Sequence, residues 1–193
     1  MKTSLEKELS QAKKKSAKPM LWVSMISMTM MFAGLTSAYV VSRKRSDWVA
    51  FDLPEAFYFS TIFIVLSSVS FILAKKFIKK DKAKLTTLFL LITLALGGFF
   101  VFFQFQGFNY LYRAGLVFAG EQSTVKSSFI YGITLAHLAH VAAGFVVLLV
   151  VLYKQINHKY SSVNFLGLEL GAIFWHFVDI LWVYLFLFFY FIR

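Results

Sequence analysis

Cysteine is missing from all 193 residues of the sequence. Its absence excludes disulfide bonds, thiolate chemistry and any metal or iron–sulfur centre held by cysteine. Recognisable catalytic motifs are lacking too: the sequence has no phosphate-binding loop, no HExxH metalloprotease motif and no Ser/His/Asp order in suitable surroundings. The sequence therefore gives no support to an enzyme that acts on its own.

Long polar stretches are scarce, because 59% of the residues are hydrophobic and 19% are aromatic. Five apolar stretches are long enough to cross a hydrocarbon core of about 30 Å, for which about 20 helical residues suffice. Backbone groups in lipid must form their hydrogen bonds internally, and these stretches are about twice as long as a barrel strand. We therefore predict an all-α integral membrane protein, a bundle of five transmembrane helices over approximately residues 20–42, 55–75, 85–111, 127–153 and 169–192.

No linker is long enough to divide the chain into two folded domains. We predict a basic N-terminal arm over residues 1–19, followed by one transmembrane domain over residues 20–193. The first apolar stretch is too long for a cleavable signal peptide, so we expect it to remain as a helix. An odd number of helices and the lack of an internal repeat weaken the case for a transporter built from inverted repeats. Small residues favour close helix packing, among them Gly34, Gly97, Gly98 and Gly144.

Acidic residues are few: nine Asp and Glu stand against twenty Lys and Arg, which gives a formal net charge of +11. The basic residues fall at helix ends, so we predict no nucleic-acid partner. Fourteen of them belong to the N-terminal arm and to residues 75–84 and 154–159, and six belong to the opposite helix ends. The positive-inside rule then predicts a cytoplasmic N-terminus and an outer C-terminus. Contacts with lipid headgroups are expected from Lys18, Lys75, Lys76, Arg43 and Arg113.

The stretch WHFVDILW places a histidine and an aspartate inside the last apolar run. Steps of three and four residues put Glu169, His176 and Asp179 on one narrow arc of a helix. A carboxylate at mid-depth costs about 2.5–3.5 kcal/mol on insertion scales, so this arc must face protein or trapped water. We expect His176 to be the partner of Asp179, and Trp175 and Trp182 to donate indole N–H bonds to the same carboxylate.

Two interpretations of this arc stay open: a proton or cofactor site, or a hydrogen-bonding staple between helices. The fourth predicted helix carries His137 and His140 three residues apart on one face, continued by Gly144. Either histidine could hold a haem together with His176; otherwise both would contact neighbouring helices or a partner subunit. A small transporter with Asp179 as its proton site is the remaining alternative.

These residues resemble subunit III of the haem–copper respiratory oxidases, a family that covers cytochrome c oxidases and quinol oxidases. WHFVDILW is similar to the signature of the family's last helix, with Glu169 at an upstream acidic position. In the fourth helix, Thr134, His137, His140 and Gly144 resemble a threonine, paired histidines and a glycine of the family. The resemblance extends over all five helices.

The early segment FAGLTSAY and Gln104 near the end of the third helix are also similar to the family. Five crossings with the N-terminus inside resemble its short form, which lacks the first two of seven helices. The chain departs from the family at Met28 and Gly107, where an acidic residue often stands.

The resemblance implies an accessory subunit of a proton-pumping oxidase that reduces oxygen to water in the cytoplasmic (inner) membrane of a bacterium. Such a subunit would be non-catalytic and bind no metal or cofactor itself; haem and copper would lie in partner subunits. It would pack directly on catalytic subunit I, beside subunit II and small subunits, and a larger respiratory supercomplex is conceivable. Its roles would be to stabilise subunit I, support proton uptake and hold structural phospholipid. The expected buried polar network is Glu169, His176, Asp179, Trp175 and Trp182, and the expected contacts between helices or subunits are Thr134, His137, His140 and Gly144.

Overall fold

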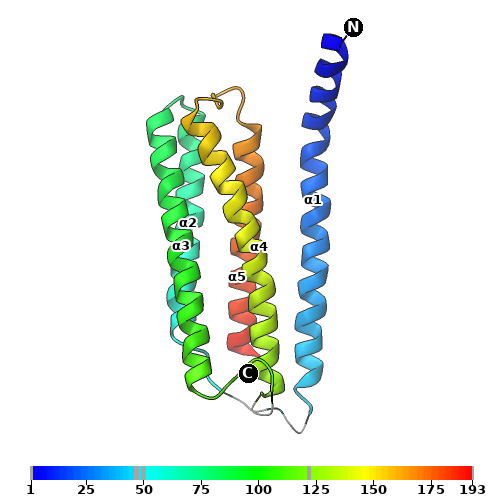
Figure 1. Ribbon diagram of the computed structural model, residues 1–193, viewed down its shortest axis with the longest axis vertical. Coiled ribbons are helices and arrows are strands. Elements are labelled where there is room, and N and C mark those ends of the chain that lie inside the picture. The colour runs from blue at the N-terminus through cyan, green and yellow to red at the C-terminus, as the bar shows by residue number, and fades with distance from the viewer. Residues whose placement is uncertain (1, 46–47, 49–50, 121–122, 193) are drawn as a thin grey trace.

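The computed structural model describes residues 2–45, 48, 51–120 and 123–192. Within these residues lie five helices and no strand: α1 (Lys2–Ser42), α2 (Ala56–Ile78), α3 (Ala83–Arg113), α4 (Val125–Ile156) and α5 (Leu166–Phe191) (Figure 1). Each helix contains a stretch long and apolar enough to cross a membrane. The predicted all-α membrane fold with five spanning helices is therefore confirmed. Arg193, one of the six basic residues counted opposite the N-terminus, lies outside the described residues.

The helices are longer than the apolar stretches that predicted them. Lys75, Lys84, Arg113 and Lys154 all lie inside helix ends, because a long side chain can carry its charge to the interface while its backbone stays helical. At the beginning of the chain, α1 runs through Pro19, so the basic arm continues the first helix. Pro19 is exposed, where water can bind the carbonyl that proline leaves without a partner. Whether the arm is a separate unit stays a prediction.

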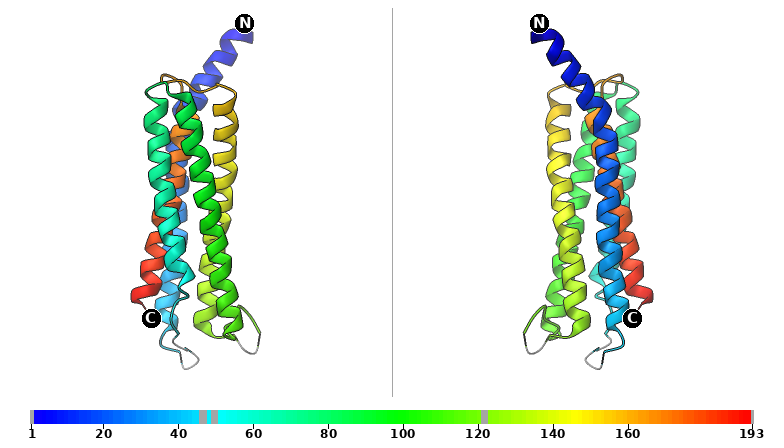
Figure 2. Two further views of the ribbon diagram at one scale, coloured as in Figure 1. Left: turned by 90° about the vertical axis from the view of Figure 1, so that its left-hand side faces the viewer. Right: turned by 90° about the vertical axis from the view of Figure 1, so that its right-hand side faces the viewer.

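Four helices form a ring, in which α2 packs on α3, α3 on α4, α4 on α5 and α5 again on α2. The remaining helix, α1, lies on the outside of α4 and α5 (Figures 1 and 2). The start of α1 and the loops over residues 79–82 and 157–165 are at one end of the bundle, and the end of α5 is toward the other (Figure 1). The basic loops are thus grouped as the charge count assumed, while the side that faces the cytoplasm stays a prediction.

One narrow face attaches α1 to the bundle. Met25, Phe32 and Tyr39 follow each other at seven-residue spacing, and each is at most 4% exposed. The Tyr39 hydroxyl donates to the backbone carbonyl of Ile192 at 3.2 Å. A seven-residue repeat keeps contacting side chains on one seam between nearly parallel or antiparallel helices. The opposite face, where Met30 is 71% exposed, has the apolar character of a surface in a membrane.

Local sequence signals fix the connection between α3 and α4. Gly115 has a φ of +76° directly after α3, and the N–H of Leu116 donates to the carbonyl of Leu111 at 2.9 Å, which is the Schellman ending that glycine favours. At the start of α4, the Thr124 hydroxyl accepts from the Ser127 N–H, and the Thr124 N–H donates to the Ser127 hydroxyl, both at 3.1 Å. These reciprocal bonds form a capping box.

Lys126 differs from a typical basic residue at a membrane edge, because it is only 1% exposed. Its Nζ donates to the carbonyl of Phe51 at 2.8 Å and lies 4.4 Å from the centre of the Phe51 ring. These contacts tie the segment before α2 to the start of α4.

Candidate functional site

The polar arc predicted on α5 occupies two separate places. Glu169 lies in the first turn of α5 with a side chain that is 25% exposed, whereas Asp179 lies near the middle of the helix and is 3% exposed. Ten residues separate them, a distance of about 15 Å along the helix axis. The structure brings His176 and Asp179 together and holds Glu169 apart from both.

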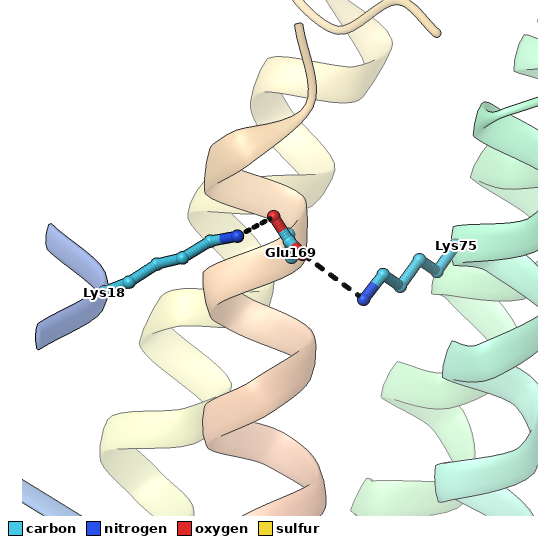
Figure 3. A network of polar contacts seen from close by, with 3 residues as sticks. All are labelled: Lys18, Lys75 and Glu169. Carbon is cyan, nitrogen blue, oxygen red and sulfur yellow. Dashed lines mark ion pairs between the residues drawn. The ribbon is translucent and has the colours of Figure 1, made fainter. Parts of the chain in front are cut away.

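Glu169 joins three helices at the end of the bundle that carries the basic loops (Figure 3). Its Oε2 lies 2.9 Å from Nζ of Lys18 on α1, and its Oε1 lies 3.7 Å from Nζ of Lys75 on α2. Lys79 is also near enough to act on the carboxylate by its charge. Three lysines around one carboxylate form a cluster with positive net charge, which we call the Glu169 cluster.

A serine of α2 contacts one of the two polar residues at the centre of α5. Nδ1 of His176 is 2.6 Å from Oγ of Ser68 on α2. Asp179 is buried, and its Oδ2 has no hydrogen-bond partner among the described residues. We expected His176 to be the partner of Asp179, whereas in the structure His176 bonds Ser68. Sequence reasoning missed Ser68.

The two indoles of WHFVDILW bind hydroxyl groups of α2. Nε1 of Trp175 donates to Oγ of Ser67, and Nε1 of Trp182 donates to Oγ1 of Thr61, both at 3.0 Å. The prediction that both indoles donate to Asp179 is therefore wrong. A neutral hydroxyl on the facing helix satisfies the indole N–H without a further charge having to be buried.

The contacts from α2 follow a regular register along α5. Thr61, Ser68 and Lys75 are spaced by seven residues, and each meets a polar residue of α5. The seven-residue spacing keeps polar groups on the seam between two antiparallel helices. This spacing is the one signal in the sequence that could have indicated these partners.

Trp175 fills a slot made by two glycines. A Cβ atom added at Gly97 of α3 would lie 3.0 Å from Cη2 of Trp175, and one added at Gly144 of α4 would lie 3.2 Å from its Cε3. The indole therefore packs directly on the backbones of two helices while its N–H bonds a third. By contrast, the positions of Gly34 and Gly98 have no atom within 4 Å of an added Cβ. Of the glycines predicted to favour packing, Gly97 and Gly144 are in close contact.

His137 lies in an aromatic environment at the centre of the bundle. Its ring is 5.2 Å from that of Trp182, 6.0 Å from that of Phe100 and 6.4 Å from that of Phe32. It is fully buried, and neither ring nitrogen has a hydrogen-bond partner among the described residues; the same is true of the buried hydroxyl of Thr134 one turn earlier. Rings from α1, α3 and α5 thus surround a histidine of α4.

His140 is less buried and binds its own helix. Its Nδ1 is 2.7 Å from the carbonyl of Ala136, and its ring lies 5.6 Å from that of Phe32 on α1. Both histidines of α4 therefore contact the same phenylalanine. Their role between helices or subunits stays a prediction.

Gly107, one of the two departures from the family resemblance noted above, faces an aromatic ring. A Cβ atom at this position would overlap the ring of Phe57, so a larger residue requires Phe57 to move. One turn earlier, Nε2 of Gln104 donates to Oγ of Ser60 on α2 at 3.0 Å. In this chain a phenylalanine fills the space that an acidic side chain would need.

The basic residues predicted to contact lipid lie at both ends of the bundle. Lys76 is exposed beside the Glu169 cluster, whereas Arg43 and Arg113 are exposed at the opposite end, after α1 and at the end of α3. Lys18 and Lys75 are paired with Glu169, as described above. Contact with lipid stays a prediction for all five.

The two loops near the Glu169 cluster are tied to each other. Asp81 adopts a φ of +54°, and its Oδ1 accepts from the backbone N–H of Ser162 at 2.9 Å. Hydrogen bonds from the side chain and from the backbone N–H of Ser162 lower the pKa of Asp81, because they stabilise the ionised carboxylate. The charge of Asp81 thus holds the loop before α5 close to the loop after α2.

Potential metal ligands are scattered through the described part of the chain. No group of three or more His, Asp or Glu side chains is placed there to hold one metal ion. The chemistry of the interior is instead that of single hydroxyl, imidazole, indole and carboxyl groups that contact another helix.

Comparison with known proteins points to one family. A family model described as "Cytochrome c oxidase subunit III" matches residues 50–193. The chain is 29% identical over 155 residues to cytochrome c oxidase subunit 3 of Alkalihalophilus pseudofirmus, and the aligned region covers 80% of this chain and 73% of that protein. It is 30% identical over 171 residues to cytochrome c oxidase subunit 3 of Thermostichus vulcanus, where the aligned region covers 86% of this chain and 82% of that protein. It is also 35% identical over 144 residues to cytochrome c oxidase subunit 3 of Schizophyllum commune, where the aligned region covers 73% of this chain and 49% of that protein.

Proposed function

The chain belongs to the cytochrome c oxidase subunit III family, and on this premise we propose that it is a non-catalytic subunit that packs directly on catalytic subunit I. An accessory subunit III of a haem–copper oxidase associates with the other oxidase subunits and is a multi-pass membrane protein. In our proposal the haems and copper belong to the partner subunits, and this chain is a helix bundle that packs beside them.

The observation that carries this proposal is that polar groups inside the bundle form hydrogen bonds between helices. Trp175, Trp182 and Gln104 each donate a hydrogen bond to a hydroxyl group on α2. Membrane hydrogen bonds of this kind contribute about 0.6 kcal/mol on average and hold helices in a defined arrangement. Polar groups that join helices favour a structural role.

We further propose that the subunit lies in a bacterial cytoplasmic membrane, with its N-terminus in the cytoplasm and its C-terminus outside. The support is the unequal distribution of basic residues, fourteen against six. The helix ends that carry the fourteen share one end of the bundle (Figure 1). A respiratory supercomplex that contains the oxidase would be compatible with this orientation.

Structural phospholipid is the ligand that we propose for the junction of α1 and α5. The Glu169 cluster supplies positive charge for a headgroup phosphate. Deeper along the same junction lies an apolar cavity of about 360 Å³, which an acyl chain could fill. Its walls are Thr29, Phe32, Ala33, Phe177, Ile180, Leu181 and Tyr184.

Native mass spectrometry of the purified oxidase tests the lipid site. Replacing Lys18 and Lys75 with Gln should reduce the amount of anionic phospholipid that remains bound to this subunit. Lys44→Gln, which changes an exposed lysine at the opposite end of the bundle, is the matched control and should retain it. Equal retention in all variants would count against a site at the Glu169 cluster.

Deletion of the chain tests the accessory role. We expect the remaining oxidase to assemble in lower yield and to lose activity faster during turnover, because subunit I would lose a supporting wall and its proton uptake would slow. Assembly and turnover lifetime equal to those of the complete enzyme would contradict the proposal. A tagged chain recovered from native membranes in mild detergent should bring down the haem- and copper-binding subunit in equal amount, and recovery of the chain alone would also contradict it.

A further inference from the structure

Three buried polar side chains of α3 and α4 have hydrogen-bonding capacity that the protein does not use. Gln104, Thr134 and His137 are fully buried. Oε1 of Gln104, Oγ1 of Thr134 and both ring nitrogens of His137 have no hydrogen-bond partner among the described residues. A buried polar group without a partner costs about 1–3 kcal/mol, so such groups are nearly always bonded to protein atoms or to ordered water. Three of them in one place would favour a partner that they share.

The hydrogen bond to Ser60 fixes the orientation of the Gln104 amide. Oγ of Ser60 donates its single hydrogen to the carbonyl of Phe57 at 2.9 Å, so toward Gln104 it can only accept. The NH₂ group of Gln104 must therefore face Ser60, with Nε2 at 3.0 Å. Because the oxygen and nitrogen of an amide diverge from the same carbon, Oε1 is left as an acceptor on the side away from this bond.

Contacts on both sides of Gln104 set its level against α4. The helices α3 and α4 are neighbours that run in opposite directions (Figure 1). The ring of Phe100, one turn before Gln104, lies 6.0 Å from the ring of His137. The ring of Phe108, one turn after Gln104, stacks on that of Tyr131 at 5.0 Å. Gln104 is therefore opposite the stretch of α4 between Tyr131 and His137.

Thr134 is in the middle of that stretch, and its hydroxyl differs from those of the other helical threonines. Six of them donate to the carbonyl four residues earlier in their own helix, as Thr93 does to Phe89 at 2.8 Å. Thr134 does not form this bond, so its hydroxyl is available to another group. His137 follows three residues later, on the same face of α4.

We propose that Gln104, Thr134 and His137 bind one buried water molecule between α3 and α4. A buried water typically makes about three hydrogen bonds to polar groups that lack other partners. The water donates one hydrogen to Oε1 of Gln104, and it bonds the Thr134 hydroxyl and one ring nitrogen of His137 with its second hydrogen and its oxygen. Together with the bond from Gln104 to Ser60, it completes a chain of hydrogen bonds from α2 through α3 to α4.

A density map of the complex that contains this chain tests the site, at a resolution that shows ordered water in the protein interior. We expect a water peak about 2.5–3.0 Å from Oε1 of Gln104. The peak should be lost in Thr134→Val, which keeps the shape of the side chain and removes the hydroxyl. Thr93→Val is the matched control: it removes a buried hydroxyl that bonds its own helix, and it should leave the peak in place.

Two results would overturn the proposal. The first is a map that shows interior water elsewhere and none here. The second is a peak of full height in Thr134→Val, because Thr134 would then not bind the water. The unaltered chain decides the first result without any variant, so the test holds even if Thr134→Val fails to fold. All three side chains belong to this chain, so neither result depends on the proposed accessory role.

Discussion

The slot for Trp175 allows a sharp test, because two adjacent glycines differ in what surrounds them. A Cβ atom at Gly97 would lie 3.0 Å from Cζ of Phe145 and 3.0 Å from two carbon atoms of Trp175, whereas one at Gly98 would meet nothing within 4 Å. Both residues are in the middle of α3. Replacing each with Ala therefore adds the same methyl group to the same helix, once against an indole and once into open space.

The expected energies follow from two opposing terms. Gly→Ala in a helix interior gains about 0.8–1.0 kcal/mol in helix propensity, and this gain is common to Gly97 and Gly98. Overpacking a filled site costs about 1–3 kcal/mol, and only Gly97→Ala has this cost. The indole of Trp175 cannot easily retreat, since Gly144 limits it on the α4 side. We therefore expect Gly97→Ala to be less stable than Gly98→Ala by about 1–3 kcal/mol.

Unfolding of the purified chain in mixed micelles by increasing SDS measures this difference. Tryptophan fluorescence follows the unfolding of the chain, which has Trp175 among its four tryptophans, and the free energy of unfolding is compared between the two variants. Gly98→Ala should equal or slightly exceed the original chain in stability. A difference between the variants below about 0.5 kcal/mol would refute the reasoning, because it would mean that Trp175 does not pack against α3 as closely as the structure has it.

Three further predictions concern contacts on α2 and α5 and the loops beside them. Thr61→Val and Trp182→Phe, alone and combined, should give a coupling energy of about 0.6–1.7 kcal/mol in the same SDS titration, and zero coupling would contradict their hydrogen bond. Glu169→Gln should lower the free energy of unfolding by about 0.2–1 kcal/mol at low salt and by less at high salt, since its lysine partners are partly exposed; a loss independent of salt would argue against ion pairing. The side chain and the backbone N–H of Ser162 lower the pKa of Asp81. Protection of the Ser162 amide from hydrogen exchange should therefore be present above the unfolded pKa of about 3.9 and be lost as pH falls through the lower folded pKa. Asp81→Ala should lack that step, and the same step in both proteins would contradict the link.

The fold could be predicted from the sequence because membrane spans are set by length and hydrophobicity, which a single sequence displays directly. The predicted boundaries were short by up to a turn at ends that carry lysine or arginine, since a charge ends an apolar window but not a helix. The first helix differed most, because the basic arm before Pro19 is helical in the structure.

The partners inside the bundle could not be predicted in the same way. Serine and threonine in membrane helices commonly bond a carbonyl of their own helix, as Thr86 and Thr93 do with Lys82 and Phe89. The sequence therefore does not distinguish such a hydroxyl from Ser68, which bridges to another helix. The charge of Asp179 indicated a carboxylate partner for the indoles, whereas hydroxyl groups of α2 satisfy them.

The spacing of the contacts on α2 determines how α5 is placed against it. Thr61, Ser68 and Lys75 meet Trp182, His176 and Glu169, a set of three polar contacts between two antiparallel helices. If α5 moved along α2 by one helical turn, about 5.4 Å, all three contacts would separate and the Trp175 indole would leave its glycine slot. Sliding would thus break the hydrogen bond of an indole, the hydrogen bond between Ser68 and His176, and an ion pair together. Hydrophobic packing holds the two helices side by side, and the polar contacts select one axial register. A surface that must match a partner subunit requires that register to be fixed.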